Sequence, residues 1–183
     1  MNLFFRFITL ILKRLKVSNP IHPFSKCVTK FRVNAFDLDL NFHMNNGRYF
    51  SIMDLGRFDI MLQSNTFWTI IKQGYYPVVS SQSIRFKKSL GPFVDFDVIS
   101  QIESWDERNL YMKQQFIKND TLYAEGFVKA RFRQRGRKKS IPTKEIFEII
   151  GMEYTEDKLS TLANTQRHIE GMLAQEESAE IKQ

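Results

Sequence analysis

Apolar and polar residues alternate along several stretches of the chain, a pattern typical of β-strands that bury one face. The first is residues 29–36, where Phe31, Val33 and Ala35 share one side. The remaining stretches follow after about residue 74 and are separated by short turn sequences; they are residues 76–88, 93–105, 109–118 and 122–134. Because short turns join consecutive strands only in antiparallel pairs, the pattern predicts an antiparallel sheet.

Residues 47–63, which lie between the first strand and the others, follow helical spacing instead. Apolar side chains occur nearly all round this helix, so we expect other structure to wrap it. A short helix around residues 143–150 and a more polar one around residues 155–175 close the chain. One strand, one buried helix and four antiparallel strands predict an α+β fold.

Composition narrows the class of protein. With 183 residues, of which 43% are hydrophobic, the chain fits one compact domain and is not intrinsically disordered. Its single cysteine, Cys27, excludes an internal disulfide and favours a reducing, cytoplasmic location. The histidines at positions 22, 43 and 168 are not spaced as a zinc site, so we expect neither a metal nor a cofactor.

Residues 1–16 form an apolar stretch with helical spacing and cations at its end. The stretch is shorter than the roughly 20 residues that span a bilayer, and it lacks the features of a signal peptide. Two interpretations stay open. The helix either lies on an anionic membrane surface, giving a peripheral membrane contact, or docks on the protein or its oligomer partner.

Polar residues are dense in the segment that leads into the helix at 47–63. Asp39, Asn41 and His43 alternate, so in an extended segment their side chains would point the same way. A helix N-terminus can stabilise a developing oxyanion, and a carboxylate beside it can act as a nucleophile or a base. The structural interpretation is equally simple, because Asp and Asn commonly cap helices and Asn-Asn-Gly is typical of turns.

The run DLDLNFHMNNGRYFSIMDLGRFD, residues 37–59, resembles the signature of hotdog-fold thioesterases of the 4-hydroxybenzoyl-CoA thioesterase-like family. The match includes Asp37, Asp39, the stretch from His43 to Tyr49, Asp54 and Arg57. The Asp39-Asn41-His43 spacing is also similar to the catalytic segment of plant-type acyl-ACP thioesterases. Two positions depart from the family pattern: Phe42 replaces the usual Gly, and Gly47 replaces the usual Ala.

The resemblance implies a hotdog fold, a long helix wrapped by an antiparallel sheet, with helical extensions at both ends. The hotdog domain would span residues 28–136, between an amphipathic extension at 1–27 and a helical extension at 137–183. In the family, such sheets join edge to edge and the active site lies between protomers. A homodimer or tetramer is therefore implied.

The resemblance also assigns roles. Asp39 would attack the thioester carbonyl or activate water, while Asn41 and His43 would orient the water or the acyl carbonyl. The substrate-binding positions would be Asn45, Asn46 and Gly47, with backbone N–H groups near the last two polarising the carbonyl oxygen. Asp54, further along the helix, is a fourth candidate substrate-binding residue, although we interpret this second carboxylate mainly as structural.

The net charge of +7 comes from short segments, because the body of the chain is neutral. In residues 129–139, Lys129, Arg131, Arg133 and Arg135 recur at every second position and share one face of the last strand. This face is a solvated edge, an anion site for the phosphates of CoA, or, less economically, a nucleic-acid surface.

The leading hypothesis is an acyl-CoA or acyl-ACP thioesterase that needs no cofactor. The alternative of another class is a protein that binds acyl thioesters without turning them over. A basic nucleic-acid-binding module is a weaker third.

Overall fold

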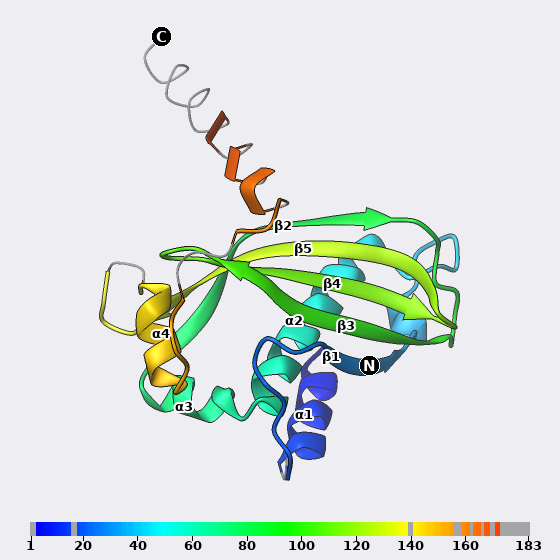
Figure 1. Cartoon of the computed structure of the whole chain (residues 1–183). Coiled ribbons are helices and arrows are strands. Elements are labelled where there is room, and N and C mark those ends of the chain that lie inside the picture. Colours follow the sequence, from blue (N-terminus) through cyan, green and yellow to red (C-terminus); the bar gives the residue numbers. More distant parts are fainter. Residues whose placement is uncertain are drawn as a thin grey trace.

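Five antiparallel strands form one sheet that curves around helix α2 (Figure 1). The computed structural model describes residues 3–15, 18–138, 141–155, 159–161, 163–165, 167–168 and 171–172. Its elements are α1 (Leu3–Arg14), β1 (Cys27–Arg32), the 3-10 turn η1 (Ala35–Asp37), α2 (Asn46–Gln63), α3 (Thr66–Lys72), β2 (Tyr75–Phe86), β3 (Asp95–Trp105), β4 (Leu110–Lys118), β5 (Thr121–Gln134) and α4 (Thr143–Ile149).

The strand order across the sheet is β1-β3-β4-β5-β2, and every neighbouring pair is antiparallel. This arrangement confirms the predicted α+β class and the wrapped central helix. The two edges differ in length, because β1 pairs over six residues whereas β2 is a strand of 12 residues. Among the described residues, the long strand β2 therefore has a neighbouring strand on one side of its backbone only.

The structure also departs from the predicted elements. The first strand ends at Arg32, four residues earlier than the pattern suggested, because the chain turns into η1. Helix α3 was not predicted; seven residues are too few to show a helical period, although Phe67 and Ile70 are buried. The predicted helix at 155–175 is described only in part, and residues 161, 163–165, 167–168 and 171–172 within it are helical.

Helix α2 and the sheet approach each other closely at Gly56. A Cβ atom on this glycine would lie 2.7 Å from Ser100 Oγ and 2.9 Å from Gln114 Nε2, both on the sheet. Gln114 Nε2 donates to the Met53 carbonyl (2.9 Å) and to Ser100 Oγ (2.8 Å), so the buried amide is satisfied on both elements. These contacts fix the position of the helix on the sheet.

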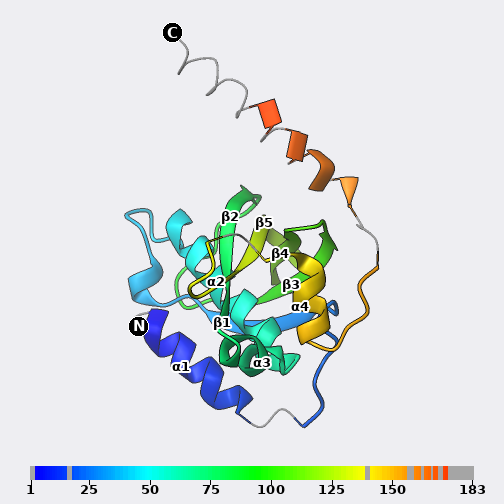
Figure 2. The same ribbon diagram turned by 90° about the vertical axis from the view of Figure 1, so that its left-hand side faces the viewer.

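Helix α1 covers the other side of α2 (Figure 2). Phe7 meets Phe58 edge-on with ring centroids 5.0 Å apart, and Leu10 is buried. Two arginines of α1 form ion pairs with buried carboxylates: Arg6 with Asp37, and Arg14 with Asp59 at 2.9 Å. The helix is thus docked on the protein, as one of the two predicted alternatives stated. No helix among the described residues is both long and apolar enough to cross a bilayer.

Replacing Arg14 by Met should lower the free energy of unfolding by about 3 kcal/mol, because Asp59 would lose its cation while remaining fully buried. Chemical denaturation measures the effect. The matched control is Lys13→Met on the exposed flank of the same helix, where we expect a change below about 0.5 kcal/mol. Equal effects of the two substitutions would show that the Arg14–Asp59 pair does not stabilise the docking.

Candidate active site

The polar segment between η1 and α2 is a tight loop and not an extended strand, which corrects the geometry on which the sequence argument relied. Leu38 and Met44 pair as an isolated antiparallel bridge, and the Asp39 N–H donates to the His43 carbonyl (2.8 Å). Phe42 closes the loop with a φ of 56°. The loop still brings Asp39, Asn41 and His43 together, because all three side chains line one cavity.

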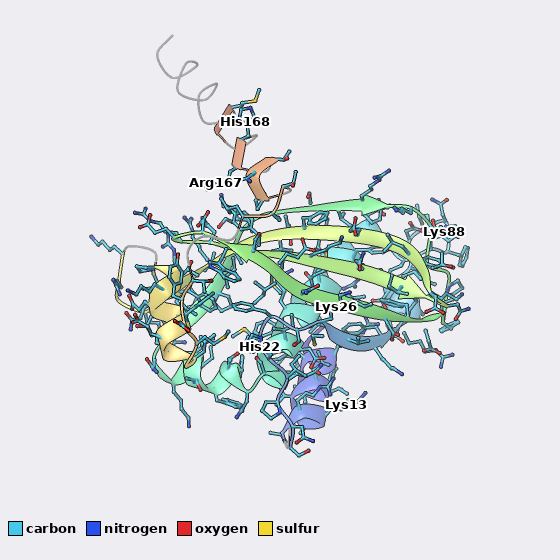
Figure 3. The ribbon with its side chains drawn as sticks, in the orientation of Figure 1. Lys13, His22, Lys26, Lys88, Arg167 and His168 are labelled. Carbon is cyan, nitrogen blue, oxygen red and sulfur yellow. The ribbon has the colours of Figure 1, made fainter. Side chains whose placement is uncertain are left out.

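This cavity has a volume of about 270 Å³ and lies beside the N-terminal end of α2. Its walls combine the loop and the start of α2 with the end of β2 and the turn after it. The lining residues are Asp39, Asn41, His43, Met44, Asn46, Tyr49, Phe86, Lys87, Lys88 and Ser89. Lys88 lies at the same end of the sheet as the loop (Figure 3).

Asp39 is the acidic residue of the cavity and is half-buried. Its Oδ1 atom accepts hydrogen bonds from the N–H groups of Asn41 (2.9 Å) and His43 (3.2 Å). These bonds hold the carboxylate in one orientation. Its Oδ2 atom accepts no hydrogen bond from a described residue, so one oxygen remains for a ligand or a water molecule.

The start of α2 separates the predicted binding residues into two groups. The Asn45 side chain accepts from the Gly47 N–H (2.9 Å), which is the capping contact that the structural interpretation anticipated. The Gly47 N–H is therefore already engaged, and neither Asn45 nor Gly47 lines the cavity. Asn46 does line it, at the positive end of the helix dipole.

Asp37 has a structural role although it lies only two residues from Asp39. It is 2% exposed, pairs with Arg6 of α1, and accepts from the Asn34 N–H (2.9 Å). Arg48 of α2 approaches it at 3.9 Å. The carboxylate of Asp37 thus joins α1, η1 and α2, and its carbonyl accepts from the Asn45 N–H (2.8 Å) at the helix start.

Asp54 lines a different cavity, of about 120 Å³, between α2 and the sheet. It is paired with Arg57, which also donates to Gln114 Oε1 (3.0 Å). Burial lowers the pKa of Arg57 to about 10, so the guanidinium stays charged at neutral pH. The other lining residues are apolar, from α2 and strands β2 to β5: Phe58, Ile60, Met61, Pro77, Val79, Ile102, Leu110, Met112, Ala130 and Phe132.

The predicted anion site on β5 does not meet Asp39 within one protomer. Arg131 and Arg133 belong to β5, and Arg135 follows its end. Phe86, at the Asp39 cavity, pairs with Ala124 at the opposite end of that strand. Seven residues at about 3.4 Å each separate Ala124 from Arg131, a distance of roughly 24 Å.

Cys27 and the metal-ligating side chains are also candidate reactive or binding groups among the described residues. Cys27 is buried, and this burial raises the pKa of its thiol to about 12, so the reactive thiolate is scarce at neutral pH. Across the described part of the chain, His, Cys, Asp and Glu side chains form no group of three or more that could hold a metal ion.

Lys87 and Lys88, which line the cavity opposite the loop, were not among the predicted site residues. Lys87 and Lys88 stand immediately before the turn signal Ser89-Leu90-Gly91-Pro92, and this adjacent pair of cations was the available signal. Nothing local showed that the turn folds back to the start of α2. The backbone contact responsible is the Met44 N–H, which donates to the Leu90 carbonyl (2.8 Å).

Fold, motif and sequence comparisons together define the class of protein. A family model described as the thioesterase-like superfamily matches residues 33–149, and the chain belongs to this superfamily. The fold is the hotdog fold of its structural relatives, which confirms the resemblance seen in the motif.

Individual relatives match over shorter stretches. Protein THEM6 of Xenopus laevis is 33% identical over 81 residues, covering 44% of this chain and 39% of that protein. A probable thioesterase of Saccharomyces cerevisiae is 28% identical over 138 residues, covering 70% and 59%. The chain thus spans about half the length of the curated relatives it matches.

Solved structures agree on the fold. The YbaW probable thioesterase of Escherichia coli superposes with a TM-score of 0.63 at 18% identity, covering 67% of this chain and 95% of that one. The protein SAV2348 of Staphylococcus aureus, solved in complex with CoA, gives 0.58 at 17% identity, covering 75% and 92%.

Replacing Phe42 by Gly should stabilise the protein by about 1 kcal/mol, because a left-handed backbone strains every side chain with a Cβ atom. Phe42 is also 73% exposed, so little packing is lost. Thermal and chemical unfolding measure the gain. Phe36→Gly, at a residue that is 74% exposed but lacks a positive φ, should not stabilise; a gain there and none at position 42 would contradict the explanation.

Proposed function

We propose that the chain hydrolyses acyl-CoA or acyl-ACP thioesters to a free acid and a thiol. The observation that carries the proposal is the Asp39 carboxylate, oriented by two backbone N–H groups, in a polar cavity beside a helix N-terminus. Membership of the thioesterase-like superfamily supports the reaction class.

In the proposed reaction, Asp39 acts on the thioester carbonyl carbon as a nucleophile or takes a proton from the attacking water. When water attacks, the C–S bond breaks and the proton that Asp39 took from the water passes to the departing sulfur, which leaves as the thiol. When Asp39 itself attacks, breaking the C–S bond leaves a mixed anhydride on Asp39; water then hydrolyses this anhydride, which releases the free acid, restores the carboxylate and supplies the proton of the thiol. Asn46, at the first turn of α2, contributes an N–H group and the helix dipole to the developing oxyanion. His43 and Asn41 line the same cavity and orient the water.

Two lysines suit the phosphates of the carrier. Lys87 and Lys88 line the Asp39 cavity, and a pyrophosphate or phosphopantetheine chain that enters it carries negative charge. The Staphylococcus aureus protein solved with CoA shares the fold, which supports this carrier class.

A second copy of the chain would bring further cations to the site. Strand β2 lies at the edge of the sheet that the described strands form, so its outer side can pair with another β2. Antiparallel pairing about the middle of β2 would place the Tyr75 end of one copy beside the Phe86 end of the other. Arg131 pairs with Val78 near that Tyr75 end, so it would approach the Asp39 cavity of the second copy.

The apolar cavity that contains Asp54 and Arg57 is suited to the acyl group. It opens beside Pro77 and Val79 of β2, so the same pairing would carry it toward the Asp39 cavity of the other copy. Its lining favours a hydrocarbon group.

Asp39→Asn should lower kcat for acyl-CoA hydrolysis by at least about a hundredfold, because the amide can neither attack nor remove a proton. The amide oxygen still accepts from Asn41 and His43, so the loop should keep its shape and the affinity for CoA should stay near the original value. The control is Asp95→Asn, at a carboxylate that is 81% exposed.

Undiminished turnover in Asp39→Asn, with folding verified by circular dichroism, would remove Asp39 from the mechanism. Binding of acyl-CoA by the unaltered chain without any thiol release would favour the alternative function, a protein that binds acyl thioesters without hydrolysing them.

The double variant Lys87→Ala/Lys88→Ala should weaken CoA binding about tenfold, since two charge-assisted contacts with phosphates are lost. Isothermal titration measures the affinity. In the paired arrangement, Arg131→Ala/Arg133→Ala should weaken it as well, whereas a site built within one protomer predicts no effect of the arginines. Unchanged affinity in both double variants would refute the cationic carrier site.

A further inference from the structure

Helix α1 has two apolar faces, and the domain covers only one of them. The inner face packs on α2 through Phe7 and Leu10. The outer face carries four large apolar side chains, each about 60% exposed: Phe4 (61%), Phe5 (59%), Leu12 (63%) and Leu15 (60%). Large apolar side chains that are exposed together mark a surface that contacts another molecule or a membrane, and this outer face has no partner in the described chain.

The charges of α1 divide in the same way. Arg6 and Arg14 point inward, and their charges are neutralised by Asp37 and Asp59. Hydrogen bonding to Asp59 raises the pKa of Arg14, so this pairing is strong. Lys13 is exposed, projects outward from α1 (Figure 3), and forms no ion pair with a residue that the structure describes.

A cationic groove runs between α1 and β1 beside the outer apolar face. It has a volume of about 170 Å³, and its charged lining residues are all basic: Arg6, Lys13, Lys30 and Arg32. Across the sheet pairing, Asp95 and Asp97 lie opposite Arg32 and Lys30, and Asp95 approaches Arg32 at 4.0 Å. Lys13 and Lys30 are exposed and form no ion pair with a described residue, whereas Arg6 and Arg32 are paired, so the two lysines are the charges most available to an anion.

We propose that α1 docks the protein on an anionic phospholipid bilayer, with Phe4, Phe5, Leu12 and Leu15 among the acyl chains and Lys13 and Lys30 at the headgroup phosphates. Apolar side chains flanked by lysines are the pattern of a helix that lies in the membrane interface. The cations match the negative surface of the cytoplasmic leaflet, in agreement with the location that the single cysteine favours.

A second copy of the chain fits this face less well. Residues 1–16 contain no acidic residue, so two α1 helices would present charges of the same sign to each other. A helix of 12 residues is also only about 18 Å long, and its face is small beside the roughly 800 Å² per partner that a stable protein interface buries. An anionic bilayer supplies the opposite charge, so electrostatic attraction adds to the burial of the apolar side chains.

The docked orientation places the candidate active site near the membrane. Figure 2 shows α1 and the segment around η1 along one side of the molecule. Arg6 of α1 is paired with Asp37, two residues before Asp39. The side chain of Phe36 in η1 is 74% exposed and can extend the contact.

The test is co-sedimentation of the full chain with phosphatidylcholine vesicles, with and without phosphatidylserine. We expect binding to the vesicles with phosphatidylserine that weakens as salt is added. Phe5→Ser/Leu12→Ser should weaken binding to both kinds of vesicle by at least roughly tenfold, because apolar groups leave the interface. Lys13→Ala/Lys30→Ala should weaken only the binding that depends on phosphatidylserine, by about fivefold for each charge.

Matched controls lie away from α1. Ile71→Ser on α3 removes an apolar side chain that is 40% exposed, and Lys144→Ala on α4 removes an exposed lysine. Neither control should change vesicle binding, and unfolding temperatures should show that all variants are folded. The test does not depend on hydrolysis, so it stands apart from the proposed function.

Three outcomes would overturn the proposal. One is no sedimentation of the unaltered chain with either kind of vesicle. Another is binding that the α1 variants leave unchanged. The third is a fall in the mass in solution of Phe5→Ser/Leu12→Ser without any loss of vesicle binding, which would assign the outer face to contact between copies.

Discussion

Helix α2 carries apolar side chains on every side, and none of its residues from Arg48 to Gln63 is exposed, so it is stable only where other structure covers it. The sheet covers one side, and its close approach is possible because position 56 is glycine. Helix α1 covers another side and supplies the cation that the buried Asp59 requires. The remaining features follow from this double cover, because the loop at the start of α2 can be rigid only if α2 itself is held in place.

Asp37 and Asp39 have identical side chains, but their surroundings give them different roles. Asp37 is surrounded by arginines and backbone donors, so its charge is fully used in holding three elements together. Asp39 is held by two N–H groups of its own loop and keeps an oxygen toward the cavity. Asp37 therefore holds the loop in place, and Asp39 is the group in the loop that can react.

Periodicity predicted the sheet and α2 because each long element repeats its apolar pattern several times. It could not predict α3, whose seven residues contain less than two full periods, nor the inward turn of Arg6 and Arg14, because their partners Asp37 and Asp59 are distant in sequence. The motif placed Asp39, Asn41 and His43 in one cavity. Their grouping results from a closed loop with a left-handed residue, and a side-chain alternation rule cannot describe such a loop. Lys87 and Lys88 joined the site only through folding of the turn onto α2.

The two ion pairs of α1 also set the order in which the protein can fold while it is being synthesised. The acidic partners of Arg6 and Arg14 lie 31 and 45 residues further along the chain. At ribosomal speeds of about 5–20 residues per second, α1 waits roughly 2–9 seconds for Asp59 to be synthesised. During that interval the rest of the domain covers neither apolar face of the helix. A nearby membrane or a chaperone can therefore bind the newly synthesised helix before it packs on α2.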